Sequence, residues 1–68
     1  MAVPQTGARV HVAVEALDEV TCDFLPRIAG KTGYAAHIDI LAGEAFVVAR
    51  PADVDGSYVP LKFITLAE

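Results

Sequence analysis

The first alternating segment of the chain covers residues 9–16, with the sequence RVHVAVEA. Side chains of a strand point alternately to its two faces, so a hydrophobic period of two indicates a strand with one buried face. We therefore expect a strand here, with three valines on the inner face and a more polar outer face. The two faces would carry Val10, Val12 and Val14 on one side and His11, Ala13 and Glu15 on the other.

Two further segments predict strands in the middle of the chain. Residues 33–40 (GYAAHIDI) alternate between Tyr34, Ala36, Ile38 and Ile40 on one face and Ala35, His37 and Asp39 on the other. Residues 44–51 (EAFVVARP) form a shorter apolar run, in which Phe46 and Val48 share one side. Pro51 ends this third strand, because proline cannot donate a hydrogen bond to a ladder.

The C-terminal part predicts two short strands. Asp55-Gly56 is typical of a hairpin turn, and the segments SYVP and FITLAE follow it, separated at Pro60. Residues 16–28 (ALDEVTCDFLPRI) do not alternate. Their first half favours a turn of helix and Pro26 prevents a long one, so we expect a long loop between the first two strands.

Five short strands, a long first loop and tight later turns predict a small all-β antiparallel barrel. A length of 68 residues indicates one domain, residues 1–68, and we expect residues 1–7 to be flexible.

The apolar content exceeds what such a small barrel can bury. Hydrophobic residues make up 54% of the chain and the mean hydropathy is +0.47. Exposed apolar patches usually mark a partner surface, so we expect association with another protein or with further copies of the chain. The residues expected on that surface are Ala13, Ala35, Val47, Ala49 and Tyr58.

The formal net charge is −4, and the five basic residues never form a run. Nucleic-acid binders usually carry a basic stripe, so this balance disfavours nucleic acid as a partner. The first loop is acidic, with Glu15, Asp18, Glu19 and Asp23. It either keeps an apolar protein soluble or, through Asp18 and Glu19, attracts a basic partner.

The sequence also indicates the cellular compartment in which the protein is found. A single cysteine permits no internal disulfide, the first residues do not resemble a signal peptide, and no apolar run is long enough for a membrane span. We expect a cytoplasmic protein with no membrane contact.

The segment Gly30-Lys31-Thr32 matches the end of a phosphate-binding loop, G-x-x-x-x-G-K-[ST]. The first glycine of that motif would fall at Leu25, and an alternating segment follows where a helix is required. Phosphate binding is therefore disfavoured. Gly30 and Gly33 are instead expected to shape a turn into the second strand, with Gly56 and Pro60 as the other turn residues.

No residues of the chain form a convincing catalytic set. Cys22 lies among acidic residues that disfavour its thiolate, so an inert thiol is expected. His11 and His37 would approach each other, beside Asp39, only if their strands are neighbours; exposed histidines are more often plain polar surface. Arg27 and Arg50 offer guanidinium groups for a carboxylate, but nothing in the sequence brings the two together. We expect no catalytic residue, no metal and no cofactor.

Two parts of the chain together resemble the SH3-like barrel group: GARVHV followed by LPRIAGKTGY, and DGSYVPLKFITLAE at the end. The resemblance covers residues 7–66 and implies a five-stranded SH3-like barrel. Within the group the chain is most similar to the C-terminal barrel of the nitrile hydratase beta subunit, through Gly-x-Arg-Val at residues 7–10, Leu-Pro-Arg at 25–27 and Gly-Lys-x-Gly at 30–33. The metal of that family belongs to the partner subunit, so the resemblance implies no ligand set here.

Other members of the group imply different functions. Peptide-binding SH3 domains use two tyrosines and a tryptophan; Asp18 and Val20 stand near the tyrosine places here, and the chain has no tryptophan. The plasmid-borne small dihydrofolate reductase shares Gly-x-Arg-Val, but its Val-Gln-Ile-Tyr strand is absent.

The sequence therefore predicts a small non-catalytic binding or accessory module that associates with a protein partner or with itself. One alternative is an oligomeric enzyme with a site at its symmetry axis, where Tyr58 and Lys62 would be tested. The other is a nucleic-acid-binding SH3-like module.

Overall fold

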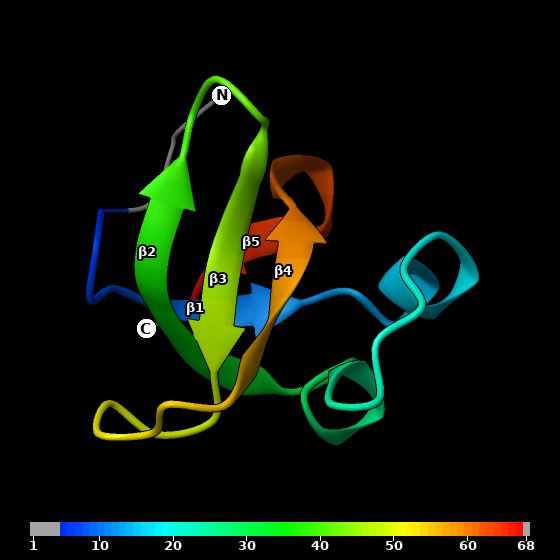
Figure 1. The fold of residues 1–68 in the computed structure, drawn as a ribbon, viewed down its shortest axis with the longest axis horizontal. Coiled ribbons are helices and arrows are strands. Elements are labelled where there is room, and N and C mark those ends of the chain that lie inside the picture. The colour runs from blue at the N-terminus through cyan, green and yellow to red at the C-terminus, as the bar shows by residue number, and fades with distance from the viewer. Residues whose placement is uncertain (1–4, 68) are drawn as a thin grey trace.

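The computed structural model describes residues 5–67, which form one antiparallel sheet of five strands and no α-helix (Figure 1). The all-β fold is thereby confirmed. Along the sheet the strand order is β4-β3-β2-β1-β5. The strands are β1 (Arg9–Val12), β2 (Thr32–Asp39), β3 (Glu44–Val48), β4 (Gly56–Pro60) and β5 (Ile64–Leu66).

The predicted long first loop is present between β1 and β2. It contains two short 3₁₀ turns, η1 (Val14–Asp18) and η2 (Leu25–Arg27), and Pro26 lies in the second. Figure 1 shows this loop standing to one side of β4. The first strand ends four residues earlier than the alternation predicts, because the chain turns into η1 at Val14, whose side chain is 54% exposed.

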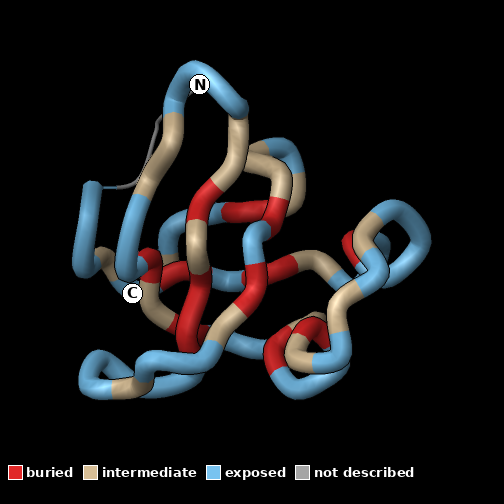
Figure 2. The backbone as a smooth tube through the Cα atoms, in the orientation of Figure 1, coloured by how far each residue is buried: buried red, intermediate tan, exposed pale blue. Residues whose placement is uncertain are grey.

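The core lies inside the bent sheet and beneath the first loop (Figure 2). Val10 and Val12 of β1 are fully buried, as the alternation predicts, and Leu25 and Ile28 close the core from the first loop. Burying a side chain of this kind contributes about 1.5–3 kcal/mol, so these positions carry much of the stability of a small domain.

The predicted grouping of Tyr34, Ala36 and Ile38 on one face of β2, with Ala35 on the other, is wrong in the first half of the strand. Ala35 is fully buried, whereas Ala36 is exposed and Tyr34 half-buried. A β-bulge causes the difference: Ala35 pairs with Val47 and His37 with Phe46, which leaves Ala36 as an extra residue. Beyond the bulge the half-buried Ile38 packs against the core as predicted, whereas Ile40 lies past the strand and is 69% exposed.

The structure shows which residues of β3 face the core and which face outward. Ala45 and Val47 belong to the core, so Phe46 and Val48 do share a side, and it is the outer one. Val48 is nevertheless only 1% exposed. The neighbours opposite it are Tyr34 in β2 and Gly56 in β4.

Of the three predicted turn glycines, Gly30 lies in a turn, whereas Gly33 and Gly56 lie within strands. Gly30 has a φ of +76°, so its positive φ agrees with the prediction that it shapes the turn into β2. Gly33 lies within β2, where a Cβ atom would be 2.6 Å from the carbonyl oxygen of Val48. Gly56 begins β4 rather than forming the hairpin turn, and a Cβ there would meet the carbonyl oxygen of Val47. These two glycines therefore permit close packing of backbone.

Pro60 ends β4, and the 3₁₀ turn η3 (Leu61–Phe63) leads into β5. The strand break predicted at this proline is confirmed. Among residues 5–67, β4 pairs only with β3 and β5 only with β1. Closure of the sheet into a barrel therefore stays a prediction.

Residues 1–4 of the segment expected to be flexible lie outside the described part of the chain. Gly7 is anchored, since its N–H donates to the carbonyl oxygen of Ala35 at 2.6 Å. Within residues 5–67, no helix is long and apolar enough to cross a membrane.

Candidate functional site

An aromatic row crosses the outer face of β2, β3 and β4. His37 lies opposite Phe46, and Phe46 lies opposite Tyr58. The Phe46 and Tyr58 rings have centroids 5.1 Å apart and planes tilted by 60°, which is a favourable aromatic arrangement. Tyr58 is 48% exposed and His37 is also exposed, so solvent reaches the row from both ends.

Two carboxylates lie next to this row: Asp39 is two residues after His37 in β2, and Glu44 is two residues before Phe46 in β3. Asp39 is directly opposite Glu44, and like charges in that relation destabilise a sheet. Asp39 Oδ1 accepts a hydrogen bond from the N–H of Ala42 at 3.0 Å, within the hairpin turn. Within residues 5–67, neither carboxylate forms an ion pair with a basic side chain. We call this surface, made by His37, Asp39, Glu44, Phe46 and Tyr58, the Tyr58 face.

A second polar surface lies on the outer side of β1 and its neighbours. His11 is opposite Thr32 in β2 and Thr65 in β5, and Arg9 follows on the same side of β1. All four side chains are exposed. Arg9 Nη2 lies 3.5 Å from Thr32 Oγ1, a weak contact, and no carboxylate pairs with it in the described part of the chain. We call this surface, made by Arg9, His11, Thr32 and Thr65, the Arg9 face.

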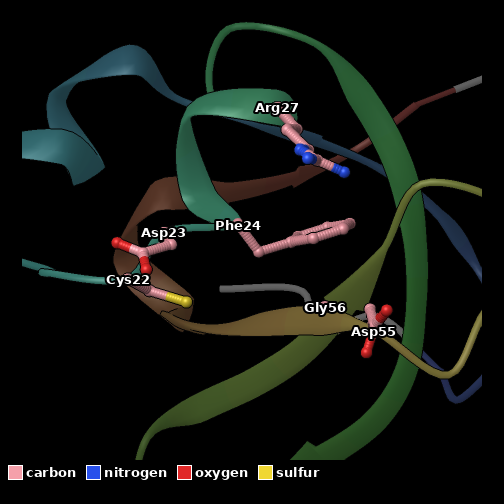
Figure 3. A pocket seen from close by; sticks show the side chains of 6 residues that line it. All are labelled: Cys22, Asp23, Phe24, Arg27, Asp55 and Gly56. Atoms are coloured by element: carbon pink, nitrogen blue, oxygen red, sulfur yellow. The ribbon is translucent and has the colours of Figure 1, made fainter.

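An open groove of about 440 Å³ separates the first loop from the start of β4. Figure 3 shows the Phe24 ring in the middle of it, between Arg27 and the β4 ribbon. The Arg27 guanidinium stacks over that ring, 5.8 Å from its centroid. Asp23 and Asp55 also line the groove, so its charges are mixed and favour no single class of ligand.

Cys22 lies at the edge of the same groove. A hydrogen bond from Ser57, together with the backbone N–H groups of Phe24 and Leu25, lowers the pKa of the Cys22 thiol, against the opposing effects of burial and of Asp23. The Ser57 hydroxyl also lies 3.3 Å from the carbonyl oxygen of Tyr58. The effects that lower the pKa thus outweigh that of Asp23, whereas the expectation of an inert thiol stays a prediction.

The acidic first loop is tied to the end of the sheet by one ion pair. Lys62 Nζ lies 2.9 Å from Glu19 Oε2 and 5.1 Å from the centre of the Phe63 ring. Glu19, expected to attract a partner, thus has an ionic partner within the chain, whereas Asp18, which is exposed like Glu19, forms no ion pair within residues 5–67. The same ion pair engages Lys62, which the enzyme alternative requires.

The residues expected on the partner surface fall into two groups. Tyr58 and Ala49 are exposed and Ala13 is half-buried. Ala35 and Val47 are fully buried, which corrects the expectation that they face outward. The β2 bulge and the inward phase of β3 account for both errors.

The two histidines lie apart on the sheet. His11 is opposite Thr32, at the start of β2, whereas His37 is in the second half of that strand. Among residues 5–67, no three His, Cys, Asp or Glu side chains are grouped so that they could hold a metal ion.

Sequence reasoning missed the pairing of Phe46 with Tyr58 and of Asp39 with Glu44. Both pairs depend on the strand register, which is set by the β2 bulge and by the length of the β3–β4 connection. The available signal was the β2–β3 hairpin: a turn over residues 40–43 places residues 39 and 44 opposite each other.

Comparisons of the chain with protein families, with curated proteins and with solved structures gave no match. The function proposed below therefore rests on the geometry of the described residues.

Proposed function

We propose that the protein is a non-catalytic association module, an SH3-like barrel that docks on a protein partner through the Tyr58 face. The observation that carries this proposal is the aromatic row of His37, Phe46 and Tyr58 on an outer sheet surface. Aromatic side chains are enriched where binding energy concentrates in protein interfaces, because they bury a large area at a low cost in conformational entropy.

Two more observations support a protein partner. Ile40 and Leu41, at the tip of the β2–β3 hairpin, are 69% and 102% exposed and adjoin the Asp39–Glu44 end of the face. Exposed apolar side chains that adjoin one another usually mark a surface that binds a partner. The net charge of −4 and the scattered basic residues disfavour a nucleic acid on this surface.

The test places a photo-reactive benzoylphenylalanine at position 58 in the protein expressed in its own cells. Irradiation is expected to give covalent adducts, because Tyr58 would lie within the interface. The control is the same label at Val54, which is 87% exposed but belongs to the β3–β4 connection. Equal adduct yields from positions 58 and 54 would contradict the proposal.

A further inference from the structure

The two outer faces of this molecule have opposite charge. The Tyr58 face carries Asp39 and Glu44, directly opposed and without a basic partner among residues 5–67. The Arg9 face carries Arg9 and His11, with no paired carboxylate in the same range. Each face thus presents the charge that would neutralise the other.

Three of the other four basic residues are engaged within the molecule. Arg50 is held by Asp53 at 3.2 Å and Lys62 by Glu19 at 2.9 Å. Arg27 stacks over Phe24 in the groove beside the first loop. Lys31, which directly precedes β2, is exposed and like Arg9 forms no ion pair within residues 5–67. Arg9 is the basic residue that lies within a strand of the sheet.

We propose that the Tyr58 face of one molecule binds the Arg9 face of a second copy, head to tail, with Arg9 contacting Glu44 and Asp39 of its neighbour. This inference rests on the proposed association function and names its partner. The Arg9 guanidinium would neutralise two carboxylates that repel each other in the single molecule, and charge-assisted hydrogen bonds from Arg to carboxylate are among the stronger polar contacts. His11, Thr32 and Thr65 would cover the Phe46 and Tyr58 rings.

The two faces are different surfaces, so the contact is heterologous. Such contacts produce a ring where the rotation between copies closes and an open series where it does not. A specific interface buries about 800 Å² on each partner. The molecule exposes 4360 Å² in all, so two such faces would use more than a third of its surface.

The test compares charge variants of the purified chain by sedimentation equilibrium. Concentrations from about 10 μM to about 1 mM are used, because this range allows the dissociation constant of a weak association to be measured. The average mass of the wild type is expected to rise with concentration beyond twice the 7.2 kDa of one chain. Glu44→Lys and Arg9→Ala should each weaken association by about tenfold or more, because each removes one side of the charge pairing.

Both variants are expected to fold. Glu44→Lys places a positive charge opposite Asp39 and relieves a repulsion. Arg9→Ala removes an exposed side chain whose polar contact is the weak one to Thr32. The matched control is Glu15→Lys, which changes the net charge as much as Glu44→Lys but lies at an exposed position of the first loop, and it should associate like the wild type.

A mixture of the two variants decides whether the contact is head to tail. Glu44→Lys retains the Arg9 face, and Arg9→Ala retains the Tyr58 face. An equimolar mixture therefore has one intact pair of surfaces and should form a one-to-one dimer, which native mass spectrometry identifies from the two different masses.

Three results would overturn the inference: a wild-type mass that stays at one chain up to the highest concentration, a plateau at two chains, or self-association of Arg9→Ala equal to that of the wild type. The proposed function fails separately. If position 58 gives adducts with a different protein while the purified chain remains single, the association module stands and the second copy is excluded as its partner.

Discussion

Gly33→Ala tests the close packing of backbone within the sheet. A Cβ atom at position 33 would lie 2.6 Å from the carbonyl oxygen of Val48 and 3.0 Å from Cγ1 of Val47. Real Cβ atoms essentially never come within 3.0 Å of such a neighbour. The Val48 oxygen belongs to the backbone of β3, so no side-chain rotation can make room for the added methyl group.

The expected loss of stability combines two opposing effects. Forcing an extra methyl group into a packed site costs about 1–3 kcal/mol, whereas replacing glycine by alanine restricts the unfolded chain and returns about 0.4–1 kcal/mol. The net destabilisation is therefore about 1–2 kcal/mol. For a domain of this size, that lowers Tm by roughly 5–15 °C.

The assay is urea and thermal unfolding followed by circular dichroism, combined with amide hydrogen exchange. In Gly33→Ala the protection of the amides where β2 pairs with β3 should fall, because β3 must move away. The control is Gly43→Ala, in the β2–β3 turn, where φ is +71° and nothing lies within 4 Å of the added atom. It carries the cost of an unfavourable backbone angle and should leave protection at Val47 and Val48 unchanged.

Two results would refute this reasoning. One is a Gly33→Ala variant as stable as the wild type. The other is a loss of stability in which exchange at Val47 and Val48 matches that of Gly43→Ala, which would assign the role of Gly33 to its backbone angles, as the sequence alone predicts.

Two further predictions concern the first loop. Ser57→Ala should raise the pKa of the Cys22 thiol, because the hydrogen bond from Ser57 is the largest influence that lowers it; the pH dependence of alkylation by iodoacetamide measures this, and an unchanged or lower midpoint would contradict it. Leu25→Ala should destabilise the protein by about 2–5 kcal/mol in urea unfolding, since Leu25 is fully buried in the core. Leu41→Ala, at a fully exposed position, should stay within about 0.5 kcal/mol of the wild type, and equal effects at the two leucines would show that the first loop does not close the core.

The all-β fold follows from alternation and punctuation in the sequence. Val10 and Val12 identify the inner face of β1 because the strand is regular and its two faces differ in polarity. Pro26 and Pro60 locate interruptions because proline restricts φ and lacks an N–H. These signals are local, so a single sequence contains them.

The errors arise where the pairing of strands decides the outcome. Ala36 is the extra residue of a bulge, and alanines at both 35 and 36 give no difference in polarity from which to detect it. Val47 and Val48 are both buried although they point to opposite faces, so hydrophobicity cannot assign either one to the core. Register is a non-local property, and it determines both.

Only part of the candidate site could be predicted, because most of its contacts join residues of different strands. Tyr58 stands out as an aromatic residue in a short strand beside Pro60, and the structure leaves it exposed. Its contact with Phe46 and the opposition of Asp39 and Glu44 join different strands. A pattern along one strand cannot reveal the residues with which that strand is paired.

The extra residue in β2 affects the bend of the sheet without affecting which side chains lie on its outer face. Ala35 points inward and His37 outward on either side of Ala36, so removing Ala36 would leave every other side chain on the face it now occupies. What would change is the bend of β2, the strand that joins the surface around Arg9 to the surface around Tyr58. The angle between successive copies in a head-to-tail series would thus be set by chain length at one position, and a family of such chains could move between closed circles and open fibres without altering a single contact residue.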